Sequence, residues 1–523
     1  MRCAMRGVRK SSVFECNKIL IYMANGMKIE LAVVLWAVAL PGAAVAEDLL
    51  KVYDDALQSD PQMREATATR MATLEAKPQA RAMLLPQITG SAAVEKDRTS
   101  EDQTSPQLFS DPANPNKLIL VQEDVSGVVR PVTSQWNVTL RQNVFNWQNW
   151  ENLKRADHTV AQAEADYRAA QEDLIQRVSQ RYFDVLTARD DLEAQQSAHE
   201  AISNQLEQAN KRYEVGLIAI TDVEEAKAAN DQAAAAVIAA KRTLATDVEQ
   251  LREITGAKYE LLSRPGPNIP LKSPEPASED RWVEISMEQN LALVSSRLAA
   301  EIARDDVRVA EGGHMPTLDI VAGHTHYRQT STEIFPEVPS IDFPGAVGPT
   351  LNEYNENSIG LQLNVPIFSS GLVTSQVHQS QYRWIAAKER MARTSRDTER
   401  AARDAFLSVN SDIAHVQALK QGLESSKIAL KATEAGYDVG TRTAVDVLNA
   451  RRTLVQAQTD YASSRYAYIL DVVSLKLASG SLDRATLAEI NQWLDETVPT
   501  SSAPATERTE ITQPPKSSAA PDR

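Results

Sequence analysis

The stretch Tyr213-Glu-Val-Gly-Leu-Ile-Ala-Ile-Thr-Asp-Val223 decides the fold of this chain, because it returns as Tyr437-Asp-Val-Gly-Thr-Arg-Thr-Ala-Val-Asp-Val447. Tyr, Val, Gly, Asp and Val recur at one offset, 437 − 213 = 224 residues. The same offset relates a second set of residues, Val248, Leu251, Thr255 and Gly256, to Val472, Leu475, Ser479 and Gly480. Self-similarity at a fixed spacing indicates a repeated structural unit. Residues 47–262 and 281–497 are therefore predicted to be two copies of one unit.

The segments outside the two copies differ in composition. Residues 263–280 contain five prolines and are predicted to be a linker between the copies. Residues 498–523 are rich in Pro, Ser, Thr and Ala, which is typical of a disordered tail.

Residues 1–46 have the pattern of a leader that directs export. The apolar run Leu31–Leu40 follows Lys28 and ends at Ala44-Val45-Ala46, as in a cleaved secretory signal. The signal proper spans about 27–46, and translation from Met1 or Met27 is equally compatible with it. A buried core helix is the alternative reading. Cleavage before Glu47 removes both cysteines of the chain, Cys3 and Cys16, which suits an exported protein.

Composition excludes several classes of protein. Apolar residues make up 43% of the chain and charged residues 24%, and the mean hydropathy is −0.35, which opposes a bundle of transmembrane helices. The net charge of 55 − 70 = −15 opposes binding to nucleic acid. The chain lacks a Gly-rich phosphate loop, His-Glu-x-x-His and Gly-x-Ser-x-Gly, so we predict neither an enzyme nor a cofactor.

His324-Thr-His326 places two imidazoles on one strand face, but no third ligand is evident and no metal site is predicted.

Each copy is predicted to begin with a helix (49–84 and 281–311) and a strand starting near Pro86 or Pro316. Proline-rich loops are expected at about 99–131 and 329–352. A strand with strict alternation of apolar and polar residues follows each loop. Its apolar members are Trp136, Val138 and Leu140 in the first copy, and Ile359, Leu361, Leu363 and Val365 in the second. This pattern fits either an ordinary half-buried sheet or a membrane sheet.

Long proline-free stretches, 148–213 and 371–437, follow these strands. Their apolar residues are spaced by three and four, which predicts helices of roughly 100 Å with coiled-coil-like packing. Each helix ends at a Val-Gly pair, where glycine permits a left-handed cap. Returning helices are expected at 221–255 and 444–479. The chain therefore offers four strands and two long helical hairpins.

Four strands are too few for a closed membrane sheet. Unpaired strand edges are not tolerated in lipid, and bacterial barrels have at least about eight strands. If the strands span a membrane, several chains must share one barrel. Phe145, Trp147 and Trp150 at the first strand-to-helix junction suit an aromatic belt at the membrane interface, or simple packing.

Over about residues 47–497 the sequence resembles the TolC family of outer-membrane efflux ducts. The resemblance is carried by four segments: Leu84-Leu85-Pro86-Gln87, Val248-Glu-Gln-Leu-Arg-Glu-Ile-Thr-Gly256, Pro316-Thr-Leu-Asp319 and Glu434-Ala-Gly-Tyr-Asp-Val-Gly-Thr-Arg-Thr-Ala-Val-Asp-Val-Leu448. It implies a mixed, mainly α fold. In it, a homotrimer forms a 12-stranded outer-membrane β-barrel, four strands per chain, continued by a long α-helical barrel across the periplasm.

The resemblance also implies a function. The chain would be the exit duct of tripartite efflux pumps and type I secretion systems. Its partners would be outer-membrane lipid, a periplasmic adaptor and an inner-membrane pump or ABC exporter. The alternatives are a periplasmic adaptor protein, which the doubled unit opposes, and a soluble coiled-coil scaffold, which the export signal and alternating strands oppose.

The resemblance assigns a gate to the hairpin tips. The Tyr437 hydroxyl would donate to Asp222, and Arg442 would reach Thr221, holding the inner end of the duct closed. Judged without the resemblance, Asp222 is a charge that favours the helix dipole and Tyr437 is a packing residue.

Two further roles follow from the resemblance. Asp446 would form a carboxylate ring in the lumen, but Asn449 stands where close family members carry a second acidic residue. The ring would then hold three carboxylates rather than six, and block by multivalent cations would be weak. An adaptor would dock on the tips, Val215, Gly216, Leu217, Val439, Gly440 and Thr441, whose glycines also serve as helix caps.

Overall fold

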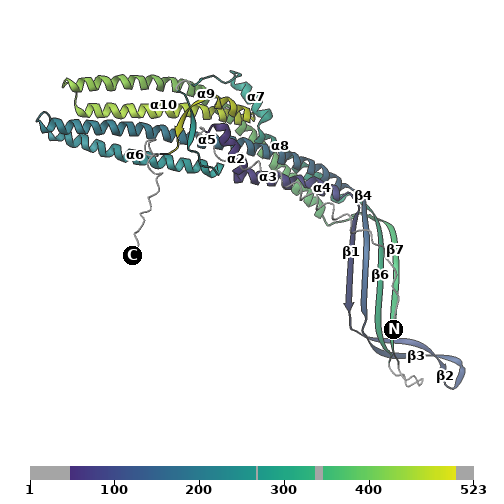
Figure 1. Ribbon diagram of the computed structural model, residues 1–523. Coiled ribbons are helices and arrows are strands. Elements are labelled where there is room, and N and C mark those ends of the chain that lie inside the picture. The colour runs from purple at the N-terminus through teal and green to yellow at the C-terminus, as the bar shows by residue number, and fades with distance from the viewer. Residues whose placement is uncertain (1–46, 267–268, 336–345, 502–523) are drawn as a thin grey trace, which may run out of the picture.

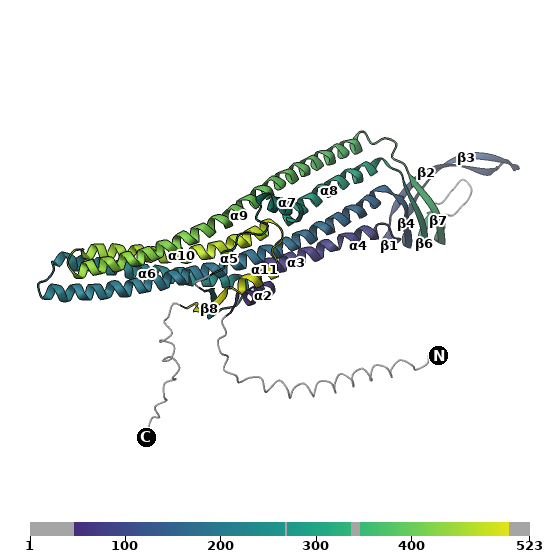
Figure 2. The same cartoon turned by 90° about the horizontal axis from the view of Figure 1, so that it is seen from above.

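The computed structural model describes residues 47–266, 269–335 and 346–501, so the predicted leader and most of the predicted tail lie outside it. The chain is elongated, with a narrow antiparallel sheet at one end and the tips of two helical hairpins at the other (Figure 1). Short helices and strands surround the middle of the long helices (Figure 2). Within the described ranges, no helix has the length and apolar character needed to cross a membrane.

The two copies have the same order of elements. The first consists of α2 (Leu49–Ser59), α3 (Pro61–Leu74), α4 (Ala76–Ala82), β1 (Gln87–Lys96), β2 (Thr99–Asp111), β3 (Asn114–Val129), β4 (Val132–Asn146), α5 (Trp147–Glu214) and α6 (Ile220–Thr255). The second consists of α7 (Glu279–Gln289), α8 (Leu291–Glu311), β6 (Thr317–Phe335), β7 (Ala346–Asn364), α9 (Leu372–Asp438) and α10 (Ala444–Ala478). The remaining elements are β5 (Leu261–Pro265), the 3₁₀ turn Gly312–His314, α11 (Arg484–Asn491) and β8 (Leu494–Pro499).

The first helix of each copy is broken, where one continuous helix was predicted. Asp60 is extended, and its carboxylate accepts a hydrogen bond from the Met63 amide at 3.1 Å, while Pro61 opens α3. Asn290 caps α8 in the same way, through the Leu293 amide at 3.0 Å. Side-chain caps and a proline at the first helical position start a new helix, so the chain changes direction at these points.

The main sheet has the antiparallel order β1-β4-β6-β7. Trp136 of β4 lies opposite Ala92 of β1 and His326 of β6, so the predicted alternation in β4 separates two faces. One face carries exposed apolar side chains, including Ile359 and Leu361, which are 82% and 73% exposed. The other face is polar. Strands β1 and β7 are the edges, with one neighbour each.

The predicted loop at 99–131 is wrong, because β2 and β3 form an antiparallel hairpin there. Proline suggested a loop, but a two-stranded ribbon has free edges and tolerates a residue without an amide hydrogen, as at Pro106. The second predicted loop is mostly strand as well. β6 and β7 pair as far as Phe335 and Ala346, with Pro349 on the edge strand. Residues 336–345 lie outside the described part.

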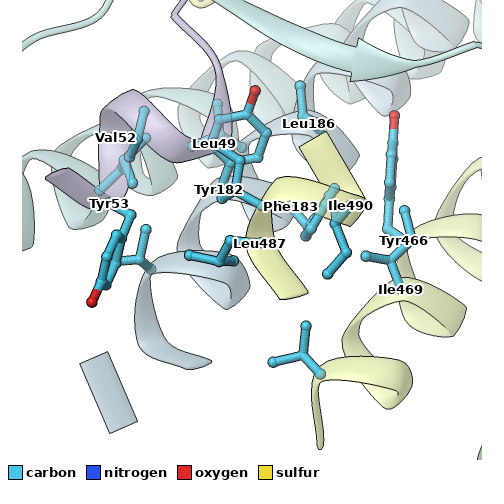
Figure 3. Close-up of a cluster of buried hydrophobic side chains, with 14 of the residues drawn as sticks. Leu49, Val52, Tyr53, Tyr182, Phe183, Leu186, Tyr466, Ile469, Leu487 and Ile490 are labelled. Carbon is cyan, nitrogen blue, oxygen red and sulfur yellow. The ribbon is translucent and has the colours of Figure 1, made fainter. Parts of the chain in front are cut away.

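The long helices match the predicted hairpins. α5 has 68 residues and α9 has 67, and α6 and α10 return beside them. The core lies where the two hairpins meet the short elements (Figure 3). Tyr182 and Phe183 of α5 belong to one buried cluster with Tyr466 of α10 and Leu487 of α11, and the Phe183 and Tyr466 rings stack with their centroids 5.7 Å apart. Burial of large side chains at the middle of the rod fixes one hairpin against the other there.

Strand structure extends into the segments predicted as linker and tail. β5 pairs antiparallel with β8, with Leu262 opposite Val498. This pairing joins the end of the first copy to the end of the second, and it was not predicted because each strand is short and contains or borders proline.

Candidate functional site

The hairpin tips are tight turns built on glycine. Gly216 and Gly440 have φ angles of 75° and 79°, in the left-handed region that favours glycine. The Leu217 amide donates to the Arg212 carbonyl at 2.9 Å, and the Thr441 amide donates to the Gly436 carbonyl at 2.8 Å. These bonds close the last turns of α5 and α9. The two predicted tip motifs therefore have the same local geometry.

Apolar side chains point into solvent at both tips. Val215, Leu217 and Val439 are 69%, 73% and 75% exposed. Gathered apolar exposure on an otherwise polar helical end is typical of a binding surface.

α10 begins with a capping box that uses the predicted ring residue. The Asp446 amide donates to the Thr443 hydroxyl at 3.2 Å, and the Thr443 amide donates to Asp446 Oδ2 at 2.9 Å. The Thr443 amide and the Thr443 hydroxyl both donate to the Asp446 carboxylate, and these two hydrogen bonds, with a smaller contribution from the Arg442 charge, lower the pKa of Asp446. Asp446 is therefore ionised at neutral pH, while exposed Asn449 lies one turn further on the same side of α10.

α6 begins differently, although Asp222 occupies the same position in the repeat. The residue before the helix is Ala219, which offers no side-chain cap. The Asp222 amide donates to the Ala219 carbonyl at 3.2 Å. Among the described residues of the chain, no hydrogen bond or ion pair engages the Asp222 carboxylate. The Asp446 carboxylate of α10 is thus engaged in capping its own helix, whereas the equivalent Asp222 carboxylate of α6 can accept a hydrogen bond from another element.

Tyr437 and Arg442, two more of the four predicted gate residues, contact neighbours that the sequence did not indicate. The Tyr437 ring lies 5.0 Å from the Arg212 guanidinium carbon, measured to the ring centroid. Arg442 lies over Gly436, where an added Cβ would come within 2.8 Å of Arg442 Cγ. Within the described part of a single chain, the structure does not bring Tyr437 to Asp222 or Arg442 to Thr221.

The two hairpins are held together weakly near their tips. A small cluster packs Leu448 of α10 against Ile202 and Ala229 of the first hairpin. Arg452 donates to the Gln232 side chain at 2.6 Å across the same boundary. By contrast, large aromatic and aliphatic residues join the hairpins at the middle of the rod. The tips can therefore separate at little cost in buried area.

The strand-to-helix junctions expose aromatic and aliphatic residues. Phe145, Trp147 and Trp150 are 40%, 36% and 51% exposed at the start of α5. Sequence reasoning missed Ile367 and Phe368 at the equivalent junction before α9, which are 92% and 86% exposed. The spacing of Phe145 and Phe368, 368 − 145 = 223 residues, was the signal that points to them.

The histidine pair on β6 has local partners. Nδ1 of His324 lies 2.7 Å from the Asn357 carboxamide oxygen, and Nδ1 of His326 lies 2.9 Å from that of Asn355. Both imidazoles also contact the Trp136 ring, at centroid distances of 5.0 and 5.9 Å. In the described ranges, no group of three or more His, Cys, Asp or Glu is placed to hold a metal ion.

An antiparallel sheet with two different faces, continued by long paired helical hairpins, is a fold that this chain shares with solved outer membrane channels. The CmeC outer membrane channel of Campylobacter jejuni has a TM-score of 0.65 at 19% identity, covering 86% of this chain and 90% of that one. VceC of Vibrio cholerae has a TM-score of 0.63 at 19% identity, covering 83% of this chain and 96% of that one.

A model described as outer membrane efflux protein matches residues 52–257 and 282–481, which are the two copies. Outer membrane protein TolC of Vibrio cholerae is 33% identical over 455 residues, which is 87% of this chain and 95% of that protein. TolC of Escherichia coli is 34% identical over 462 residues, covering 87% and 86%. The chain belongs to the outer membrane efflux protein family.

This membership confirms the predicted location and class of function. The chain is an outer-membrane channel for efflux and type I secretion, with its helices extending into the periplasm. The secretion branch includes the alkaline protease secretion protein AprF of Pseudomonas aeruginosa, which is 24% identical over 85% of this chain. The family consists of channel proteins rather than enzymes, and the alternative of a periplasmic adaptor is not supported.

Proposed function

We propose that three copies of the chain form one duct, in which the four-stranded sheets close a barrel of 3 × 4 = 12 strands. The observation that carries this proposal is the main sheet itself. It exposes an apolar face, and its edge strands β1 and β7 each lack a second neighbour within the described chain. In lipid these edges must pair, and pairing them between protomers satisfies both.

The polar face of the sheet then lines the pore. Arg141 and Asp319 form an ion pair there, with 2.5 Å between Nη2 and Oδ2. A pore lined with such groups keeps solutes hydrated. The aromatic residues Phe145, Trp147 and Trp150 lie at the level where the barrel meets the helices, which suits the periplasmic interface of the membrane.

The duct conducts and does not catalyse, so energy comes from its partners. We place a periplasmic adaptor on the exposed apolar tips around Val215-Gly216-Leu217 and Val439-Gly440-Thr441, and an inner-membrane pump or ABC exporter behind it. The helical shape of the tips favours a partner that is itself a helical hairpin, because such surfaces pack ridges into grooves.

The gate in this proposal consists of Tyr437–Asp222 and Arg442–Thr221 contacts that form when the tips of the trimer close. The unoccupied carboxylate of Asp222 supports this role, because a hydroxyl donor can approach it without displacing a capping residue. Hydrogen bonds to a charged group contribute about 1.5–3 kcal/mol each. A threefold set is enough to hold the tips and weak enough for an adaptor to release.

The gate is tested with Tyr437→Phe combined with Arg442→Ser in planar bilayers. We expect a larger single-channel conductance than in the parent, because the tip contacts are lost. Tyr213→Phe is the matched control, since Tyr213 is the repeat equivalent of Tyr437 and is 44% exposed. Parental conductance in the double variant would reject the gate.

The duct as a whole is tested by deleting the gene and measuring drug sensitivity and secreted protein in the same strain. We expect a defect in at least one of these, with heat-resistant trimers extracted from the outer membrane of the parent. A monomer that fractionates with soluble periplasmic proteins would exclude the duct.

A further inference from the structure

Arg212 links the two hairpins of one protomer at their tips. It lies in the last turn of α5, and its guanidinium carbon is 5.0 Å from the centroid of the Tyr437 ring. Its Nη2 atom is 3.8 Å from Asp438 Oδ1. Tyr437 and Asp438 end α9, so one side chain from the first hairpin contacts two neighbouring residues of the second.

This contact is not a property of the repeat. The residue equivalent to Arg212 in the second copy is Gly436, at 212 + 224. A larger residue there would displace Arg442, because an added Cβ would lie 2.8 Å from Arg442 Cγ. One hairpin tip therefore carries a cation that reaches across, and the other carries a cation that lies back on its own helix. The cation of this contact therefore comes from α5, and both of its partners lie on α9.

The contact uses a part of Tyr437 that the proposed gate leaves unused. A cation over an aromatic ring interacts with the face of the ring. The hydroxyl, at the ring edge, stays available to donate to Asp222. The two interactions are therefore compatible in one closed arrangement, and substitution can remove them separately.

We infer that Arg212 is a third gate residue, a positioning residue that ties the α5 tip to the α9 tip through the Tyr437 ring and the Asp438 carboxylate. The inference rests on the proposed gate and adds a contact that acts on a different part of Tyr437. Because the contact joins hairpins that must separate for the inner end to widen, it favours the closed duct.

The tie is exposed, so its effect is moderate and depends on salt. The side chains of Arg212 and Asp438 are 36% and 72% exposed. Exposed ion pairs are screened as the Debye length falls from about 10 Å at 0.1 M salt to about 3 Å at 1 M. Loss of Arg212 should therefore raise the open probability by about two- to tenfold in 0.1 M KCl, and less in 1 M KCl.

The experiment records full-length trimers in planar bilayers and compares Arg212→Gln with Lys211→Gln. Lys211 is the neighbouring residue, and it pairs with Glu207 on its own helix, so its substitution removes the same charge without touching the second hairpin. We expect a higher open probability in R212Q, parental behaviour in K211Q, and a smaller change in R212K, which keeps the charge. Heat-resistant trimers in each variant show that assembly is intact.

Tyr437 variants separate this inference from the proposed gate. R212Q should still act in a Tyr437→Phe background, which keeps the ring and loses the hydroxyl. It should have no further effect in a Tyr437→Leu, Asp438→Asn background, which removes both partners. If Y437F opens the channel while R212Q behaves like K211Q, the gate stands and the Arg212 inference is wrong. If R212Q acts and Y437F does not, the hydroxyl contact of the gate is rejected and the Arg212 tie stands. If neither acts, both fail.

Discussion

At the scale of residues, Asp222 and Asp446 occupy equivalent positions in the two copies but differ in their hydrogen bonds. Both are the third residue of a returning helix. Thr443 before α10 occupies the Asp446 carboxylate, whereas Ala219 before α6 leaves that of Asp222 free. One hydroxyl therefore decides which acid caps its helix and which can bind another element.

In the proposed duct, we expect Asn449 to limit the strength of cation binding in the lumen. Asp446 is ionised, but its carboxylate accepts hydrogen bonds from Thr443, and three copies of the chain would place only three such carboxylates around the axis. We expect weak block by a trivalent cation such as hexamminecobalt, and stronger block in Asn449→Asp, which adds a second carboxylate on the same side of α10. The measurement is block of single-channel current at several cation concentrations. An unchanged block constant in N449D would remove these residues from the selectivity ring.

Glu172 makes stability depend on pH. It is 9% exposed on α5, and burial raises its pKa from 4.5 to about 7. The folded chain therefore holds this proton more tightly than the unfolded chain, so stability is greatest below pH 4.5 and falls as pH rises to about 7. The difference corresponds to about 3 kcal/mol per chain at most.

We expect parental trimers to dissociate at a lower temperature at pH 8 than at pH 5, and Glu172→Gln to reduce that difference. Thermal dissociation in detergent, followed by gel mobility, measures it. Glu200→Gln is the control, because Glu200 is an exposed acid on the same helix. If E172Q and E200Q change the pH dependence equally, burial of Glu172 is not its cause.

At the scale of elements, the β5–β8 pair clasps the two copies together through Arg264. Its guanidinium contacts Glu496 of β8 at 2.8 Å and Asp190 of α5 at 3.1 Å. Asp190 also accepts a hydrogen bond from the Tyr466 hydroxyl at 2.6 Å. Burial raises the pKa of Asp190, and these partners oppose that rise. The clasp therefore depends on a charge network rather than on strand length.

We expect Arg264→Met to destabilise the trimer by about 3 kcal/mol per chain, because it leaves Asp190 with less compensation in a buried site. Arg484→Met is the control. Arg484 pairs with Asp54 at the surface, where both side chains are exposed, so its loss should cost about 1 kcal/mol or less. Thermal dissociation of trimers compares the two, and equal shifts would show that the clasp contributes no more than a surface pair.

At the scale of the whole molecule, side-chain packing between the two hairpins is extensive at the middle of the rod and sparse at the hairpin tips. The large core joins both hairpins to α2 and α11 at the middle of the rod, while the tips share small contacts. Movement of the tips can then leave the barrel and the middle unchanged. A duct that opens at its inner end needs this distribution of packing.

The proposed trimer places β1 of one protomer beside β7 of the next. The chain from Glu47 to Arg523 contains no cysteine, so any disulfide cross-link between chains must come from cysteines that are introduced by mutation. We expect at least one pair drawn from Ser91 or Ala93 on β1 and Ser358 or Gly360 on β7 to cross-link chains into a ladder that ends at the trimer. The matched control places the second cysteine at Thr139 on central β4. Cross-links there equal to those at β7, or a ladder ending at the dimer, would contradict the shared barrel.

Sequence alone determined the doubled unit, the four barrel strands and the two long hairpins. These follow from periodicity and from the offset between Tyr213 and Tyr437, because alternation and helical spacing are local properties of the chain. It could not determine the β2–β3 hairpin, because proline in that segment suggested a loop. It also could not determine the β5–β8 clasp, which depends on pairing across more than two hundred residues.

The candidate site divides in the same way. The tip motifs, the aspartates and Tyr437 are visible in the repeat, because the two tips have one local geometry. Arg212 breaks the repeat, and its contact with Tyr437 exists because two hairpins distant in sequence lie side by side. Tertiary structure decided which side chains meet at the tips, since packing at the middle of the rod sets how the hairpins align.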